Sequence, residues 1–277
     1  MMPLLEAETL ISLALREDIG DGDITTSSII QGAVGSAARL IAQQRLVVAG
    51  LDVVQRVFEK LDPEVKVRKH RTDGDAVAAG EVVLAIEGSA AALLAGERIA
   101  LNFIQRLSGI ATLTESFVAR VRSYPVKICD TRKTTPGWRA LEKYAVKMGG
   151  GTNHRIGLFD AVLIKDNHIK AAGSIEEAVR RVRANLPAGF PVEVETGTLA
   201  EVREALASGA NTIMLDNMST AMMREAVQLI DKRALIEASG NVRLETVEEI
   251  AATGVDFISV GALTHSAPAV DISMKIG

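Results

Sequence analysis

The pattern of apolar and polar positions divides the chain into two regions with different periodicities. Residues 4–18 carry apolar side chains at helical spacing and stop at a run of turn formers, so they predict a first helix. Between residues 36 and 87, short β-branched runs alternate with Gly and Asp turns, which predicts a small sheet. The Ala- and Leu-rich stretch at 90–122 predicts long helical structure, interrupted at Ser108 and Gly109 because glycine weakens a helix.

From residue 126 onward, short apolar strands alternate with helices. The predicted strands lie at 126–129, 161–164, 192–194, 212–215, 234–236 and 257–260, with helices such as 175–186, 199–208 and 244–253 between them. This alternation is typical of a parallel sheet wrapped by helices. A closed barrel of eight units usually takes about 250 residues. We therefore expect a shortened, open α/β barrel of about six β/α units.

Composition narrows the class of protein. A chain of 277 residues is long enough for two unequal domains, and 48% hydrophobic against 3% aromatic residues predicts a core of Ala, Val, Leu and Ile. The net charge of −4 gives no general attraction to nucleic acid or to anionic membranes. A single cysteine, Cys129, excludes an internal disulfide framework. Because no apolar stretch approaches the roughly 20 residues of a membrane helix, we expect a cytoplasmic protein.

Candidate chemistry lies where the predicted strands end, because the loops at the carboxyl ends of such strands converge on one mouth. The segment 126–155 holds seven Lys or Arg against two acids, although the whole chain is acidic. Some of these cations fit the solvated face of a helix. Arg132, Lys133, Arg155 and Lys165 adjoin strand ends or a glycine loop, and Arg and Lys suit the capture of carboxylate or phosphate.

The later strand ends carry acids and then glycines. Glu195 and Asp216 suit sugar hydroxyls or a hard cation such as Mg²⁺. From strand alternation we expect Glu193 to face away from Glu195. The last two ends present Ser239-Gly240-Asn241 and Gly261, where backbone N–H groups can approach a phosphate. Together these features indicate a phosphorylated sugar that meets a second anionic molecule.

Several segments resemble the signature segments of the quinolinate phosphoribosyltransferase family over nearly the whole chain. They are REDIGDGDIT at 16–25, GER at 96–98, SGIAT at 108–112, DTRKTTPG at 130–137, GGGTNHRIGL at 149–158, LIKDNH at 163–168, VEVE at 192–195 and LDN at 215–217. The resemblance implies an N-terminal α/β sandwich domain at residues 1–110 and an open α/β barrel at 111–277, with C-terminal residues able to pack back on the first domain. It further implies a homodimer with shared active sites, larger assemblies being left open.

The resemblance also implies an activity. The family transfers phosphoribosyl from phosphoribosyl pyrophosphate to quinolinate with Mg²⁺, releasing pyrophosphate and CO₂ and giving nicotinate mononucleotide for NAD synthesis. Catalytic roles would then fall to Lys133, Glu195 and Asp216. The expected substrate-binding residues are Arg98 from the partner subunit, Arg132, Lys133, His154, Arg155, Lys165, Glu195, Asp216, Ser239, Gly240, Asn241 and Gly261. Glu195 and Asp216 would contact the metal largely through substrate and water.

Three alternatives stay open at this point. A molybdenum-transport-associated relative shares the architecture but differs at the substrate-binding cations. An aldolase could use Lys165 as a Schiff-base nucleophile, because a lysine in a dry site can become nucleophilic. A phosphate-sensing module would bind without turnover. The roles of His168 and His265 also remain undecided between site contacts and hydrogen bonds to the backbone.

Overall fold

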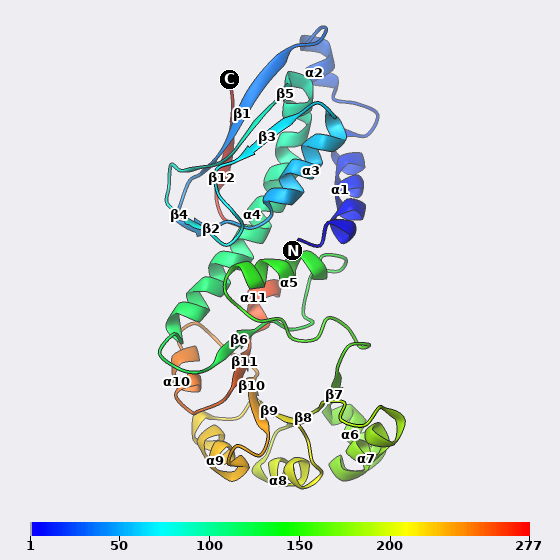
Figure 1. Cartoon of the computed structure of the whole chain (residues 1–277), viewed down its shortest axis with the longest axis vertical. Helices are drawn as coiled ribbons and strands as arrows, with labels where there is room; N and C mark the ends of the chain where they lie inside the picture. Colours follow the sequence, from blue (N-terminus) through cyan, green and yellow to red (C-terminus); the bar gives the residue numbers. More distant parts are fainter. Residues whose placement is uncertain (1) are drawn as a thin grey trace. The chain divides into compact units, whose positions relative to one another are not determined.

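The computed structural model describes residues 2–277, which fall into two compact units that are each described by themselves (Figure 1). Unit 1 comprises the chain up to Glu115 together with residues 134–150 and 263–277, and unit 2 comprises residues 116–133 and 151–262. The elements of unit 1 are α1 (Leu4–Ile19), α2 (Ile24–Ile29), β1 (Gly35–Ala42), β2 (Leu46–Val47), α3 (Leu51–Leu61), β3 (Lys66–Lys69), β4 (Ala76–Val77), β5 (Val82–Ser89), most of α4 (Ala90–Arg120), α5 (Arg139–Met148), α11 (Ala262–His265) and β12 (Ile272–Ile276).

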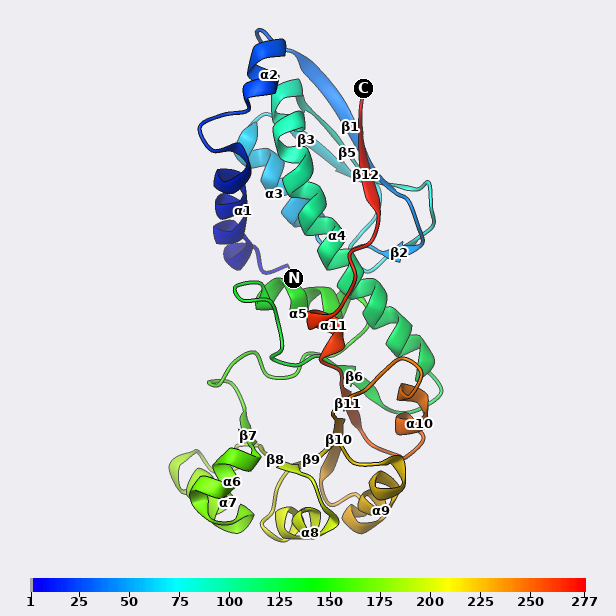
Figure 2. The same cartoon turned by 180° about the vertical axis from the view of Figure 1, so that it is seen from behind.

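Unit 1 is built on an antiparallel sheet in the order β12-β1-β5-β3. Leu40 of β1 lies opposite Leu84 of β5 and Met274 of β12, and all three side chains are buried. Figure 2 shows β12, drawn in red, running beside β1. The predicted first helix and small sheet are confirmed. The amphipathic helix α3 was not predicted within the 36–87 region, and neither was the short helix α2.

Helix α4 is continuous from Ala90 to Arg120, so the predicted interruption at Ser108 and Gly109 is wrong. Gly109 is required for another reason. A Cβ atom placed there would lie 2.1 Å from the carbonyl oxygen of Pro268 in the C-terminal segment. The glycine therefore allows that segment to pass directly over the helix. Among the described residues, no helix combines the length and the apolar character needed to cross a bilayer.

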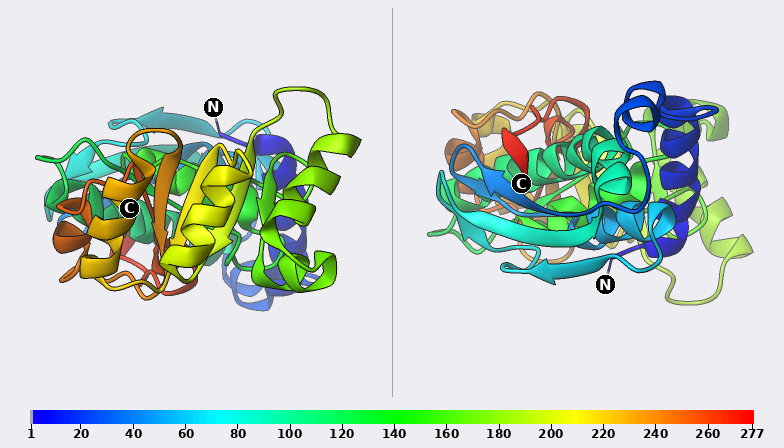
Figure 3. Two further views of the ribbon diagram at one scale, coloured as in Figure 1. Left: turned by 90° about the horizontal axis from the view of Figure 1, so that it is seen from below. Right: turned by 90° about the horizontal axis from the view of Figure 1, so that it is seen from above.

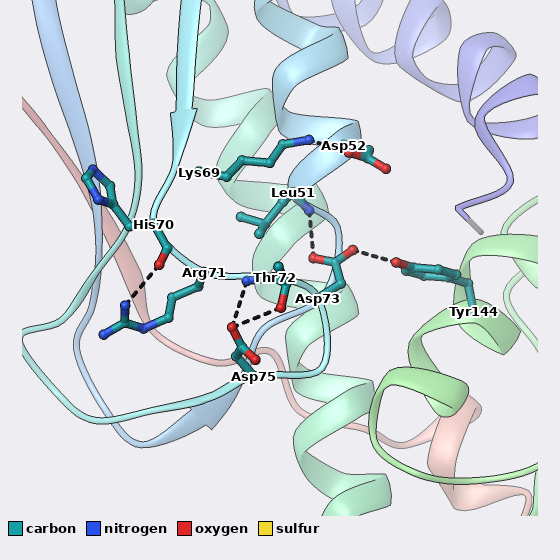
Figure 4. A pocket seen from close by; sticks show the side chains of 9 residues that line it. All are labelled: Leu51, Asp52, Lys69, His70, Arg71, Thr72, Asp73, Asp75 and Tyr144. Carbon is teal, nitrogen blue, oxygen red and sulfur yellow. Dashed lines mark hydrogen bonds and ion pairs between the residues drawn. The ribbon is translucent and has the colours of Figure 1, made fainter.

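A half-buried aspartate joins three separate segments of unit 1 (Figure 4). The Asp73 carboxylate accepts hydrogen bonds from the backbone N–H groups of Gly50 and Leu51 at the start of α3, and from the Tyr144 hydroxyl on α5. Burial raises the pKa of Asp73, although these three donors oppose the shift. Asp73 therefore caps α3 and lines a pocket of about 480 Å³ that contains none of the predicted site residues.

Unit 2 contains a six-stranded parallel sheet in the order β6-β11-β10-β9-β8-β7. Its elements are β6 (Lys127–Cys129), β7 (Val162–Ile164), α6 (Asp166–Ala172), α7 (Ile175–Asn185), β8 (Val192–Thr196), α8 (Leu199–Ala207), β9 (Thr212–Asp216), α9 (Thr220–Ile230), β10 (Leu235–Ser239), α10 (Val247–Ala251) and β11 (Phe257–Ser259). Helices α7, α8 and α9 lie side by side along the sheet (Figure 3, left). The six predicted strands and the open sheet are confirmed, because β6 and β7 do not pair with each other.

Substitution of Gly109 by Ala should destabilise the protein, because the new methyl group would overlap a backbone oxygen rather than a flexible side chain. Alanine normally stabilises a helix interior relative to glycine, so the expected sign is reversed here. We expect a loss of about 1–3 kcal/mol in the free energy of unfolding, the usual cost of overpacking, measured by urea denaturation.

Gly35→Ala is the matched control, because a Cβ atom at Gly35 would meet no atom within 4 Å. Stabilisation by Gly109→Ala would show that the C-terminal segment moves away from α4 without cost.

Candidate functional site

The parallel sheet of unit 2 gathers most of the predicted site residues along its carboxyl edge. Arg132 and Lys133 follow β6, Gly261 follows β11, and Gly240 and Asn241 follow Ser239 at the end of β10. Asp216 ends β9, Glu195 lies next to the end of β8, and Lys165 follows β7. His154 and Arg155 lie on the segment between α5 and β7. Arg98 is an exposed residue of α4 in unit 1 and belongs to a different compact unit.

The segment that carries His154 and Arg155 runs beside β6. Thr152 donates to the Ile128 carbonyl and accepts from the backbone N–H of Asp130, so it extends the edge of the sheet by one parallel bridge. Next along the segment, the His154 backbone N–H donates to the buried Asp130 carboxylate at 2.9 Å. The segment is therefore held at fixed register against the strand that ends in Arg132 and Lys133.

Arg155 lies near a second cation. Its Nη1 donates to the Ala161 carbonyl at 3.1 Å, which holds the guanidinium near the start of β7. Burial lowers the pKa of Arg155, and the charge of Arg132 lowers it further, whereas Glu193 and Asp160 oppose both effects. Two guanidinium groups in one another's field make this region positive, which suits an anionic ligand.

The His154 imidazole turns into the interior of unit 2, where it meets two buried carboxylates. Nε2 lies 3.1 Å from Glu193 Oε2 and 3.3 Å from Glu237 Oε2. Glu193 comes from β8 and Glu237 from β10, the two strands on either side of β9. The two glutamates and the imidazole form a cluster, called the His154 cluster below, in which all three side chains are at least four-fifths buried.

Hydrogen bonding defines where protons lie in the His154 cluster. Burial lowers the pKa of His154, whereas its hydrogen bonds to Glu193 and Glu237 and their charges raise it. Burial also raises the pKa of Glu193. The Arg155 backbone N–H donates to Nδ1 at 2.8 Å, so Nδ1 carries no proton. The ring proton of the neutral imidazole therefore lies on Nε2, which faces the two carboxyl oxygens.

The expectation that Glu193 faces away from Glu195 is wrong. Residues two positions apart in a strand project from the same face, so strand alternation places both carboxylates on one side of β8. Glu193 lies deeper in the sheet and bonds to His154, whereas Glu195 lies nearer the strand end. Glu237 was also missed. Its signal in the sequence is an acid two residues before the Ser239-Gly240 turn, in the middle of an apolar strand.

The acids near the ends of β8 and β9 have different partners. Lys165 Nζ lies 2.8 Å from Glu195 Oε2, so the ion pair joins the ends of β7 and β8. Asp216 Oδ2 accepts from Asn217 Nδ2 at 2.7 Å, and Asn217 Oδ1 accepts from Asn241 Nδ2 at 3.0 Å. Asn217 therefore links Asp216 to the glycine loop after β10, a role that sequence reasoning missed.

Gly240 lies where a side chain would not fit. Its φ is +96°, and a Cβ atom there would lie 2.2 Å from Asn217 Oδ1. The flanking Asn241 also has a positive φ of 51°. Successive unusual backbone conformations of this kind expose N–H groups to an anion, which fits the predicted phosphate loop.

The acids at this edge are suited to a hard cation that is bound mainly through substrate phosphates and water. Glu195 and Asp216 supply oxygen atoms, which Mg²⁺ prefers, but Glu195 Oε2 is paired with Lys165 and Asp216 Oδ2 with Asn217. Across residues 2–277, three metal-ligating side chains come together only in the His154 cluster. The residues fit Mg²⁺ that keeps waters and substrate phosphates as ligands, rather than an all-protein cage.

Two histidines left undecided by the sequence have local partners. His168 Nδ1 accepts from the Lys165 backbone N–H and forms part of the capping box of α6. His265 Nδ1 lies 2.6 Å from the Ser266 hydroxyl. These local hydrogen bonds account for both rings, and we assign neither histidine a role at the carboxyl edge of the sheet.

Comparison with known proteins agrees with this arrangement. Residues 23–108 match the family model of the quinolinate phosphoribosyl transferase N-terminal domain, and residues 110–275 match that of the C-terminal domain. A probable nicotinate-nucleotide pyrophosphorylase (carboxylating) of Synechocystis is 49% identical over 95% of this chain and 90% of that protein. The corresponding Bacillus subtilis protein is 46% identical over 98% and 94%.

Solved structures give the same result. NadC from Streptococcus pyogenes superposes with a TM-score of 0.95 at 44% identity, covering 99% of this chain and 97% of that one. The nicotinate-nucleotide pyrophosphorylase from Francisella tularensis gives a TM-score of 0.96 at 40% identity, covering 100% and 98%. Both family models and these near-complete relatives lead to one conclusion: the chain belongs to the quinolinate phosphoribosyltransferase family.

Proposed function

We propose that this chain transfers the phosphoribosyl group of phosphoribosyl pyrophosphate to quinolinate, giving nicotinate mononucleotide, pyrophosphate and CO₂ for NAD synthesis. The observation that carries the proposal is the agreement between full-length relatives named for this reaction and the sheet edge of unit 2. That edge combines cations, carboxylates and glycine turns. The enzyme is then a pentosyl-transferring glycosyltransferase.

The cations serve the pyridine dicarboxylate. Arg132, Arg155 and Lys165 come from three segments near the edge strands β6 and β7, so they can approach two carboxylates from different sides. Guanidinium groups bind carboxylates through paired hydrogen bonds, whereas lysine adds a mobile point charge. Direct contact of the His154 ring with quinolinate stays a prediction, because in the structure the ring nitrogens bond to Glu193, Glu237 and the Arg155 backbone.

The acids and glycine turns serve the sugar phosphate. As the bond between the ribose C1 and the pyrophosphate oxygen breaks, positive charge develops on the sugar, and Glu195 and Asp216 can stabilise it. The turns at Ser239, Gly240, Asn241 and Gly261 offer backbone N–H groups to the phosphate, and Lys133 faces the leaving pyrophosphate. Mg²⁺ would neutralise pyrophosphate charge, with Glu195 and Asp216 reaching it largely through substrate and water.

Bond formation and decarboxylation then need no side-chain nucleophile. The pyridine nitrogen forms the new bond to C1 and becomes cationic. The bond to the adjacent carboxylate breaks with loss of CO₂, its electron pair stays on the ring carbon beside that nitrogen, and a proton from solvent completes the product. The protein contributes by holding both anions in reacting geometry, which can supply roughly 7–11 kcal/mol.

We further propose a homodimer in which Arg98 completes the quinolinate site of the partner subunit. Its support is the family resemblance of GER at 96–98 and the exposure of Arg98 on α4. The cytoplasmic location rests on composition and the single cysteine.

With phosphoribosyl pyrophosphate and Mg²⁺, purified protein should convert quinolinate to nicotinate mononucleotide, with release of ¹⁴CO₂ from labelled substrate. With nicotinate, kcat/KM should be lower than with quinolinate by about 100-fold or more. Nicotinate has one carboxylate, so some of the cations in the site would have no partner. Omission of Mg²⁺ should abolish turnover. Equal kcat/KM values for the two acids would contradict a dicarboxylate site.

Glu195→Gln and Asp216→Asn should each lower kcat by about 10- to 100-fold, a range typical for loss of one electrostatic stabiliser. Quinolinate binding, measured by calorimetry, should change much less, because these acids act on the sugar and metal side. Glu176→Gln, an exposed acid in the first turn of α7, is the control. If either variant lost quinolinate binding but kept its single-turnover rate, Glu195 and Asp216 would act on the quinolinate side instead.

Arg98→Ala and Lys133→Ala chains should each be nearly inactive alone, because every site then lacks one cation. After exchange of subunits, heterodimers contain one intact site, and random mixing should return about a quarter of wild-type activity. Native mass spectrometry of differently tagged chains measures the exchange. Confirmed heterodimers without recovered activity would show that Arg98 does not act across the dimer.

A further inference from the structure

The His154 cluster occupies the interior of unit 2 at a cost in stability. The side chains of Glu193 and Glu237 are 11% and 4% exposed. Among the described residues, the buried atoms without a hydrogen-bond partner include Oε1 of both glutamates. They also include Oγ of Ser259, which lies on β11 beside β10. Buried carboxyl oxygens without partners are unfavourable, and well-packed apolar side chains often replace buried charges with a gain in stability. Folding alone does not explain this pair of acids.

A buried acid in unit 1 shows what a structural carboxylate looks like in the same chain. Glu142 of α5 is fully buried, and both of its oxygens accept hydrogen bonds. Oε1 accepts from Arg106 and the Thr135 hydroxyl, each at 2.8 Å, and Oε2 accepts from the Thr135 backbone N–H at 3.1 Å. Glu193 and Glu237 instead direct one oxygen each to the same imidazole nitrogen.

The tautomer of His154 argues against a metal ion between these three side chains. A metal bound at Nε2 would use the lone pair of that nitrogen and leave the proton on Nδ1. Nδ1 accepts from the Arg155 backbone N–H at 2.8 Å, so it presents its own lone pair. Nε2 therefore carries a proton and donates it to the carboxyl oxygens, which makes the cluster a hydrogen-bonded assembly.

The imidazole connects this assembly to the backbone of the next residue. Its Nε2 is held by β8 and β10, while Nδ1 holds the N–H of Arg155. On the other side, the His154 backbone N–H is held by Asp130 after β6. The backbone is thus held at two successive peptide units, by Asp130 at His154 and by the imidazole at Arg155.

We propose that Glu193 and Glu237 are positioning residues for quinolinate binding, which act through the His154 imidazole to hold Arg155 at the carboxyl edge of the sheet. The proposal rests on the proposed function, because it assigns Arg155 to the quinolinate side. Neither glutamate needs to touch the substrate. Their effect should therefore appear in quinolinate affinity and leave phosphoribosyl pyrophosphate affinity nearly unchanged.

The test compares Glu237→Leu with Glu237→Gln in full-length protein. Leucine removes the oxygen that accepts from Nε2, whereas glutamine keeps one. Ser259→Ala is the matched control, because it removes a buried hydroxyl of the same sheet that has no hydrogen-bond partner. For each variant, KM for both substrates, kcat, quinolinate Kd and the thermal midpoint are measured.

Glu237→Leu should raise KM and Kd for quinolinate by about tenfold or more, the effect of losing one positioned hydrogen bond to a charged group. Its kcat and its KM for phosphoribosyl pyrophosphate should stay within about threefold of wild type, and its thermal midpoint should be unchanged or higher. Glu237→Gln should restore quinolinate KM to within about threefold, and Ser259→Ala should match wild type. Glu193→Leu should reproduce the Glu237→Leu pattern.

Several results would overturn the positioning role. One is an unchanged quinolinate KM in both leucine variants, and another is an equal loss in both substrates. Failure of both leucine variants to fold would make the carboxylates structural. Stoichiometric metal in wild-type protein, lost in Glu237→Leu by elemental analysis, would make the cluster a metal site. Absence of turnover by wild-type protein would instead refute the proposed function, and it is measured separately.

Discussion

Parallel pairing of six short strands is the constraint on which the candidate site depends, because it brings segments between residues 130 and 261 to one edge. The order of strands in the sheet differs from their order in the chain. As a result, the cations Arg132, Lys133 and Lys165 follow the two edge strands, β6 and β7, while acids and glycine turns follow the four central strands. The candidate site therefore has cations at both borders and acids and glycine turns in the middle.

Electrostatic balance explains why this edge is suited to two anions. Burial and the charge of Arg132 lower the pKa of Arg155, and the acids Glu193 and Asp160 oppose this effect. A dicarboxylate ligand would add negative charge beside these two guanidinium groups. The ion pair between Lys165 and Glu195 joins the ends of β7 and β8, so that a cation at the border of the sheet and a more central acid belong to one charge network.

Local patterns predicted the elements that are regular and missed those that depend on distant contacts. The strands of unit 2 and the residues after them were predictable, because apolar runs end in polar residues. Helix α3 was missed because its two adjacent valines resemble a strand, and its start depends on Asp73 from a distant loop. The reason for Gly109 lies in Pro268, and the reason for Gly240 lies in Asn217. Glu237 could be located only when β8 and β10 were placed on either side of β9.

The pairing of β12 with β1 also has a consequence for the order of folding during synthesis. Gln43 at the end of β1 donates to Ser273 of β12, which is separated from it by 230 positions. The ribosome must therefore release nearly all of the described chain before the first sheet gains its edge strand. Until then one side of β1 is an exposed template for pairing with other chains. Contacts of such long sequence separation slow folding, so this edge of β1 stays unpaired longer than the edge that pairs with β5.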